Sequence, residues 1–209
     1  MTTALYEKYA VLLLDYSLSI KEGQTVLIRS TALATPLLQV IYRELLKRGA
    51  IPEFELTFEN QNRLFFDHVS PEGNKHVNLL YAHAVQNFDA IINIIAPYNL
   101  QELKGVNPDK KLARQNVLAP LKKTFMNRSA QKQLNWVLCV YPTEAAAKEC
   151  GMSLEDYENF VFKACHLYEF NPIQSWQQLS QYQQQIVDLL NTKSHFHFKG
   201  PGTDISFST

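Results

Sequence analysis

Short strand-like segments alternate along this chain with longer segments of helical periodicity, and this alternation most constrains the fold. The expected strands are residues 25–29, 52–58, 89–96 and 137–141. Pro97 and Pro142 end two of them, because proline has no N–H to give to a strand ladder. Strands and helices that alternate at this spacing are typical of βαβ units. We therefore predict an α/β fold, with a mostly parallel open sheet of at least four strands and helices on both faces.

The helical segments carry apolar stripes and recognisable stop signals. The expected helices are residues 5–19, 33–48, 71–86 and 109–133, the last interrupted near Pro120, with further helices starting near Thr143, Ser153 and Pro172. Gly49 is expected to end the second helix. Residues 52–58 alternate apolar and polar side chains, which predicts an exposed or edge strand, whereas the apolar run over 89–96 predicts a buried one.

A C-terminal β-hairpin is expected over residues 195–208. Polar and apolar side chains alternate on both sides of the turn sequence Gly200-Pro201-Gly202. We expect residues 1–193 to form an N-terminal α/β domain and residues 194–209 to form a hairpin at the start of a second domain. One hairpin face is apolar, so the hairpin either adds an edge to the main sheet or packs against a neighbouring chain.

Residues 136–157 combine a strand, a stop, a helix, a turn and a second helix. The apolar run over 137–141 is long enough for a buried strand, and Thr143 can cap the Ala-rich helix that follows. Gly151 ends that helix. Ser153 then opens another helix with Asp156 three residues later, as in a capping box.

Local physics does not explain the particular string Y-P-T-x-x-A-x-x-x-x-G-M-S-L-E-x-Y that starts at Tyr141. This string resembles the metal-dependent aminopeptidases of the aminopeptidase T, aminopeptidase S and PepS family, also called thermophilic metalloproteases. Two further segments carry the same resemblance in the same order. They are the opening helix and first strand (residues 8–26, continuing to 50) and the segment G-P-G-T-D-I over residues 200–205.

The resemblance implies a metal-dependent aminopeptidase that releases N-terminal amino acids from peptides, as a homodimer with two divalent ions (zinc, cobalt, manganese or magnesium). In the family, the metal ligands are Glu, His, Tyr and Asp residues that follow the G-T-D segment. This sequence continues only five residues past Asp204. We therefore assign no catalytic, cofactor-binding or metal-binding residue in it, and expect the 209-residue chain alone to be inactive. The alternative function is a non-catalytic α/β module that binds a ligand or a partner.

Composition excludes several classes of partner. The chain has 20 basic and 20 acidic residues and no Lys/Arg cluster, so no nucleic-acid partner is expected. Its apolar runs are shorter than the roughly 20 residues of a membrane span. The first residues lack the basic start and apolar stretch of a signal peptide, so we predict a cytoplasmic protein.

The cysteines and the first strand–helix turn raise two further functions. Cys139, Cys150 and Cys165 have no C-x-x-C spacing, and a buried reduced thiol is expected at Cys139 rather than a catalytic one or a disulfide. Residues 30–36, between the first strand and the next helix, contain no glycine. A dinucleotide site needs glycine there for close backbone approach to a pyrophosphate, so nucleotide binding is not favoured.

The sequence His195-Phe196-His197 is a candidate metal motif, because alternate strand residues point to one side, and Asp204 across the hairpin offers a carboxylate. Zinc prefers three or four ligands, so we favour a polar strand face over a metal site. The other histidines have no defensible ligand spacing, although the pair seven residues apart is expected to share a helix face: His68, His76, His83 and His166. A group of acidic residues is assigned to helix capping rather than to acid–base catalysis: Glu144, Glu149, Glu155, Asp156 and Glu158.

Overall fold

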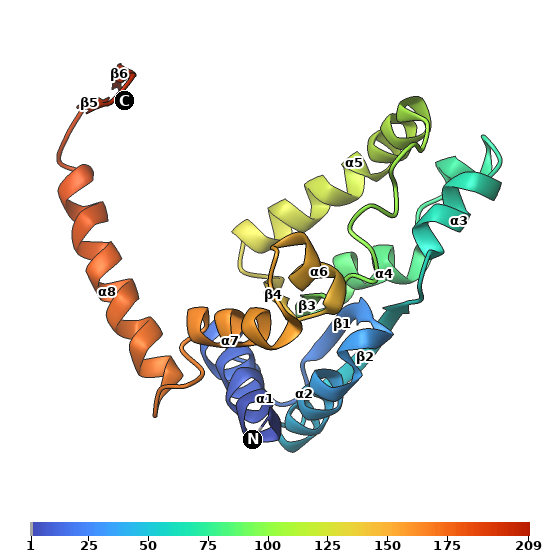
Figure 1. The fold of residues 1–209 in the computed structure, drawn as a ribbon, viewed down its shortest axis with the longest axis horizontal. Helices are drawn as coiled ribbons and strands as arrows, with labels where there is room; N and C mark the ends of the chain where they lie inside the picture. Colours follow the sequence, from blue (N-terminus) through green and yellow to red (C-terminus); the bar gives the residue numbers. More distant parts are fainter. Residues whose placement is uncertain (1) are drawn as a thin grey trace. The chain divides into compact units, whose positions relative to one another are not determined.

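The computed structural model describes residues 2–209, which divide into two compact units (Figure 1). The first unit extends to Tyr168 and holds a four-stranded sheet with its helices. The second unit, Glu169–Thr209, holds one helix, α8 (Pro172–Leu190), and a β-hairpin. No helix within residues 2–209 is both long enough and apolar enough to cross a membrane.

The sheet of the first unit is parallel throughout, as predicted. Its strands are β1 (Thr25–Thr31), β2 (Ile51–Thr57), β3 (Ala90–Ile95) and β4 (Asn135–Val140). They lie in the order β2-β1-β3-β4, so β1 and β3 are central neighbours although β2 separates them in the chain. Each strand passes to the next through at least one helix, which is what parallel neighbours require.

The two central strands are buried on both faces. Val26, Ile28 and Ile92 are fully buried on the face covered by α1 (Thr2–Val11), the π-helical turn η1 (Leu12–Ser17) and α2 (Thr35–Lys47) (Figure 1). Leu27 and Ile91 belong to an apolar cluster on the opposite face, which includes residues of α4 (Leu79–Asn87) and α5 (Pro108–Ala130). Parallel sheets need such two-sided cover, which explains why these strands read as continuous apolar runs.

Of the two edge strands of the sheet, β2 was predicted to be exposed and β4 was not. β2 is an edge strand, as its alternating pattern predicted. The prediction that residues 137–141 form a buried strand is wrong, because β4 is the other edge and leaves Trp136 46% and Leu138 55% exposed. The buried Tyr9 hydroxyl partly replaces a neighbouring strand there, since it donates to the Val140 carbonyl (3.2 Å) and accepts from the Val140 N–H (3.3 Å).

The helix caps after β4 form as predicted. The Thr143 hydroxyl accepts from the Ala146 N–H at the start of α6 (Glu144–Glu149). Gly151 follows α6 with a positive φ of 67°. The Ser153 hydroxyl accepts from the Asp156 N–H (3.1 Å) and donates to the Asp156 carboxylate (2.7 Å), which opens α7 (Leu154–Ala164).

Two helical predictions need correction, and one helix was missed. Residues 71–86 do not form one helix: α4 begins at Leu79, because the Asn78 side chain accepts from the N–H groups of Leu80 and Tyr81 and caps it there. Only a 3-10 turn, η3 (Gly73–Lys75), precedes it. The helix α3 (Gln61–His68) was not predicted. α5 continues through Pro120 without interruption, although proline removes one helical N–H and crowds the preceding turn.

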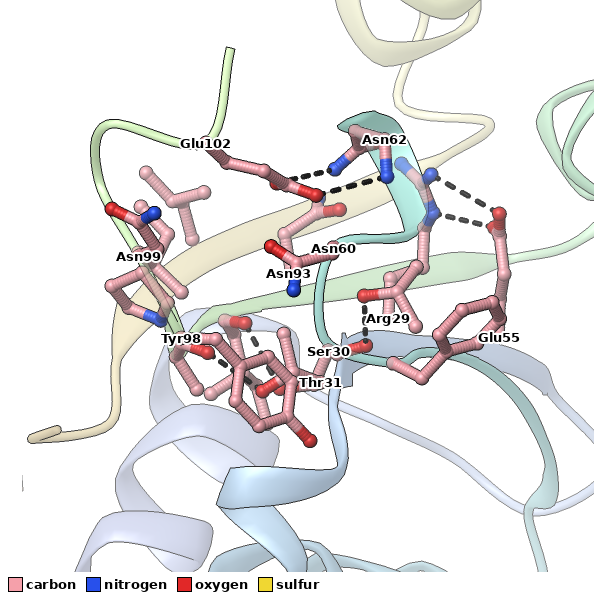
Figure 2. Close-up of a pocket in the computed structure, with 17 residues that line it drawn as sticks. Arg29, Ser30, Thr31, Glu55, Asn60, Asn62, Asn93, Tyr98, Asn99 and Glu102 are labelled. Carbon is pink, nitrogen blue, oxygen red and sulfur yellow. Dashed lines mark hydrogen bonds and ion pairs between the residues drawn. The ribbon is translucent and has the colours of Figure 1, made fainter. Parts of the chain in front are cut away.

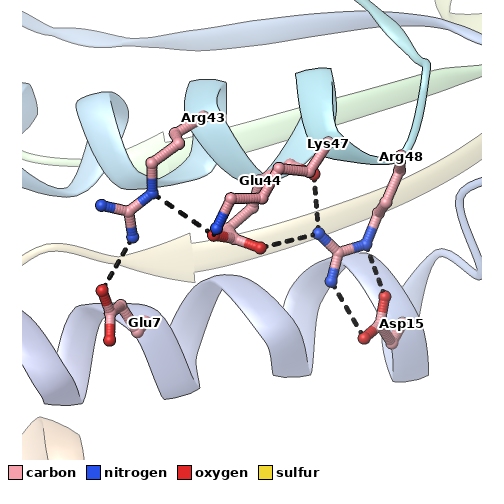
Figure 3. Close-up of polar contacts among 6 residues, drawn as sticks. All are labelled: Glu7, Asp15, Arg43, Glu44, Lys47 and Arg48. Carbon is pink, nitrogen blue, oxygen red and sulfur yellow. Dashed lines mark hydrogen bonds and ion pairs between the residues drawn. The ribbon is translucent and has the colours of Figure 1, made fainter.

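An ionic network joins the first two helical segments of the fold (Figure 3). Arg48 pairs with Asp15 (2.7 Å) and with Glu44 (3.1 Å), while Arg43 links Glu44 to Glu7. The hydrogen bond from Lys47 is the largest influence that lowers the pKa of Glu44, and Arg48 adds to it. The network therefore links α1–η1 to α2 on one face of the sheet, although exposed pairs of this kind contribute little to stability.

The second unit ends in the predicted hairpin. β5 (His195–Gly200) pairs antiparallel with β6 (Thr203–Ser208), and the Phe196 and Phe207 rings stack with centroids 5.3 Å apart. These strands form a two-stranded sheet of their own. Phe198, Ile205 and Phe207 are each about half exposed.

Two glycines that follow helices offer a matched test of local packing. Gly49 (φ 69°) and Gly151 (φ 67°) both adopt the left-handed conformation, which costs a residue with a Cβ about 1–2 kcal/mol. An added Cβ at Gly49 would lie 2.8 Å from Glu22 Cγ, whereas one at Gly151 would meet no heavy atom within 4 Å. We predict that Gly49→Ala lowers the free energy of unfolding more than Gly151→Ala does, as measured by urea denaturation. Equal losses would contradict the close packing at Gly49.

Candidate functional site

A polar pocket lies at the carboxyl ends of the parallel strands (Figure 2). Its volume is about 390 Å³, and its floor is formed by the ends of β1 and β3. From β1 the chain crosses to β2 on one side, whereas β3 connects to β4 on the other. The pocket therefore opens at the topological switch point of the sheet, where ligands of open α/β folds bind.

Side-chain hydroxyls hold the floor of the pocket together. Ser30 Oγ donates to the Ile94 carbonyl (3.0 Å) and Thr31 Oγ1 donates to the Ala96 carbonyl (2.6 Å). Thr31 Oγ1 also accepts from the Leu33 N–H, which starts the 3-10 turn η2 (Ala32–Ala34) ahead of α2. These bonds extend the contact between β1 and β3 beyond their ladder and leave no hydroxyl at the floor uncommitted.

One wall of the pocket is an ion pair between neighbouring strands. Arg29 Nε donates to Glu55 Oε2 at 2.6 Å, and the register of β1 and β2 places the two residues side by side. Asn78 Nδ2 donates to the other Glu55 oxygen at 2.8 Å. The Arg29 guanidinium carbon lies 3.8 Å from the centre of the Tyr81 ring, a cation–π contact. Both charges of the pair are thus compensated within the protein.

Another wall of the pocket is built from Glu102 and the start of α3. Glu102 Oε1 accepts from the N–H groups of Asn62 and Arg63, and Oε2 accepts from the Asn62 side chain (Figure 2). The carboxylate therefore replaces the missing N-cap of α3, whose preceding residue Asn60 has a left-handed φ of 61° and no side-chain cap bond. A carboxylate at this helix end also complements the helix dipole.

Three uncharged side chains remain available for a ligand. Within residues 2–209, the side chains of Asn60, Asn93 and Tyr98 have no hydrogen-bond partner, although all three line the pocket. An amide side chain offers one acceptor and two donors, and a phenol offers one donor and one acceptor. The site can therefore bind a polar ligand through neutral hydrogen bonds, while its charged groups are already paired.

Comparison with known proteins identifies the family of this chain. The family model described as thermophilic metalloprotease (M29) matches residues 2–209. The chain belongs to this family. Aminopeptidase 2 of Geobacillus stearothermophilus is 28% identical over 210 residues, which cover 94% of this chain and 50% of that protein. The solved structure of wild-type AmpT from Thermus thermophilus has the same fold, with a TM-score of 0.79 at 21% identity, and covers 100% of this chain and 54% of AmpT.

The match confirms the resemblance seen in the sequence motifs and sets its extent. The M29 chain described here spans about half the length of the two relatives. A metalloprotease implies bound metal, but residues 2–209 contain no group of three or more His, Cys, Asp or Glu side chains placed to hold an ion. The described residues therefore do not fit the metal site that the family implies.

The candidate metal motif of the hairpin has only paired contacts. His197 Nε2 lies 2.7 Å from Asp204 Oδ1, and His195 Nδ1 lies 2.7 Å from Ser208 Oγ. The two histidines alternate along β5 as predicted, and each contacts a residue of β6. The structure thus brings together one imidazole and one carboxylate, which fall short of the ligand number that zinc requires.

The remaining candidates are dispersed. The expectation that His76 and His83 share a helix face is wrong, since α4 begins after His76. The acidic side chains after β4 lie at helix starts, as predicted, for Glu144 in α6 and for Glu155 and Asp156 in α7. The pocket residues themselves were not predicted, because they come from separate chain segments with no common motif.

The three cysteines have different environments. Cys139 is buried, as predicted, and burial raises the pKa of its thiol to about 12. Burial also raises the pKa of Cys165, whose Sγ lies 3.8 Å from the buried Tyr9 hydroxyl. Cys150 is exposed at the end of α6.

These environments predict selective thiol chemistry. At about pH 8, Ellman's reagent should label Cys150 rapidly and leave Cys139 unreacted until the protein unfolds, because only a thiolate attacks the reagent. Cys150→Ser should remove the fast phase, and Cys139→Ala should retain it. Mass spectrometry of the peptides identifies which cysteine has been labelled. Rapid labelling of Cys139 in the native protein would contradict the burial of this thiol.

Proposed function

We propose that this chain is the N-terminal α/β domain of a metal-dependent aminopeptidase that releases N-terminal amino acids from peptides. The match of the M29 family to residues 2–209 carries this proposal. The similarity to Aminopeptidase 2 supports the proposal, and the match covers 50% of that protein.

In this proposal the metal ligands are supplied from outside residues 2–209, which offer no suitable group. Two divalent ions, of zinc, cobalt, manganese or magnesium, would activate water and polarise the scissile carbonyl when bound. The domain described here would then form one side of the peptide-binding site. It would also contribute to a homodimer in the cytoplasm. Residues 1–193 would form that domain, and the hairpin at 194–209 would lead into the metal-binding one.

One observation favours a second function, a non-catalytic module that binds a ligand or a partner. The switch-point pocket is lined by residues of this chain, and it presents unpartnered amide and phenol groups among residues 2–209. A pocket of this kind can act without a metal domain. The two functions make different predictions for catalysis.

An assay with amino-acid p-nitroanilides and added cobalt, zinc or manganese separates them. We predict no turnover by the purified 209-residue chain, and turnover by the complete product of its gene that chelator abolishes and metal restores. Turnover by the 209-residue chain that survives repurification and is lost with chelator would place the active site within it. A complete gene product that stays inactive with all three metals would favour the binding module.

A further inference from the structure

A row of four side chains crosses the sheet where it borders the polar pocket. The strand register pairs Glu55 with Arg29, Arg29 with Asn93, and Asn93 with Leu138, and all four residues line the pocket. Paired residues of neighbouring parallel strands point to the same face and are separated by one strand spacing, about 4.8 Å. The Asn93 side chain is therefore held between Arg29 and Leu138 on the central strand β3.

Asn93 is the best-positioned free hydrogen-bonding group of the pocket. It is half-buried, and its amide has no hydrogen-bond partner among residues 2–209. The other unpartnered amide, Asn60, is exposed in the loop before α3. An amide presents an acceptor and donors side by side, so it can form two parallel hydrogen bonds with a ligand that offers the opposite pair. Asparagine recognises adenine in this way, through an amino group and a nearby ring nitrogen.

The pocket also contains two aromatic rings that contact no other ring among residues 2–209. Phe58 is 61% exposed, whereas Tyr98 is half-buried and follows β3 on the same segment as Asn93 (Figure 2). A planar ring that lies against an aromatic face is removed from water and gains stacking energy. The end of β3 therefore offers both a pairing amide and a stacking face for a planar, neutral ligand.

The charges of the pocket disfavour an anionic ligand. Its charged lining consists of one arginine and two carboxylates: Arg29, Glu55 and Glu102. Arg29 pairs with Glu55 at 2.6 Å, and Glu102 accepts from backbone N–H groups at the start of α3. Among the described residues, no other cation lines the pocket to bind a phosphate or a carboxylate. The turn after β1 also lacks the glycine that close backbone approach to a phosphate favours.

We propose that the polar pocket binds a neutral nucleobase or nucleoside in which an amino group adjoins a ring nitrogen, as in adenine. Asn93 accepts from the amino group and donates to the ring nitrogen, and the base stacks on Tyr98. The pocket volume of about 390 Å³ is within the range of small-molecule sites. The proposal rests on the second function given above, the binding module, for which it names the ligand class, and it does not require aminopeptidase activity.

Isothermal titration of the 209-residue chain with adenosine and two matched probes tests this ligand class. Purine riboside lacks the amino group of adenosine, and adenosine monophosphate adds a phosphate. We expect purine riboside to bind about tenfold more weakly than adenosine, and the monophosphate to bind no more tightly. Equal affinity for adenosine and purine riboside, tighter binding of the monophosphate, or no binding of adenosine at millimolar concentration would overturn the proposal. None of these results affects the p-nitroanilide assay, which decides the aminopeptidase function separately.

Variants locate the base within the pocket. Asn93→Asp should weaken adenosine binding about tenfold and allow guanosine to bind, because a carboxylate accepts from the two adjacent N–H groups of guanine. A gain of guanosine affinity cannot arise from misfolding. Tyr98→Leu should weaken adenosine binding about tenfold through loss of stacking, and Tyr98→Phe should retain it. Tyr42→Leu is the matched control, because Tyr42 is an exposed tyrosine of α2 that does not line the pocket. Unchanged adenosine affinity in both Asn93→Asp and Tyr98→Leu would place the ligand elsewhere and overturn the proposal.

Discussion

The pairing of β1 with β3 is the constraint on which the rest of the structure depends. These strands are neighbours in the sheet, while the chain visits β2 between them. Because both are buried on both faces, α1 and α2 must cover one side, and α4 and α5 the other. The half-buried Asp89 reinforces the pairing, since its carboxylate accepts from the Thr25 N–H (2.8 Å) and hydroxyl (2.9 Å) at the start of both strands.

The same pairing creates the polar pocket. At the carboxyl ends of β1 and β3 the connections diverge, which leaves the polar pocket between them. β2 brings Glu55 beside Arg29, and the resulting ion pair is partly buried, with side-chain exposures of 31% for Arg29 and 16% for Glu55. Polar groups therefore collect on one side of this pair, while aromatic and aliphatic groups of α3, α4 and α5 collect on the other. The chain offers a polar binding pocket and no assembled set of metal ligands among its described residues.

The elements that sequence predicted well have strong local signals. The four strands, the caps at Thr143 and Ser153, and the stop at Gly49 depend on proline, hydroxyl and glycine chemistry that acts over a few residues. α3 has no such signal, because it has no side-chain cap of its own and no buried residue. Its N-terminus is completed by Glu102, forty residues away, which no local pattern can show.

The errors at β4 and at the site have a tertiary cause. An apolar run predicts a strand, but only the strand order reveals that β4 is an edge with Trp136 and Leu138 exposed. The pocket could be anticipated only in part: the rule that ligands bind at carboxyl strand ends points to Arg29 and Asn93. Asn60, Tyr98 and Glu102 also line the pocket, but they lie in loops, and only the folded structure brings these loops to the strand ends.

Native-state hydrogen exchange tests the central role of the β1–β3 pair most directly. Amides buried in a cooperative core exchange only through global unfolding, whereas peripheral elements open locally. We expect the ladder amides of β1 and β3 to be the slowest in the chain, with those of the exposed hairpin β5–β6 exchanging much faster. Protection in the hairpin equal to that of β1 and β3, or exchange of the central strands through local opening, would contradict this account.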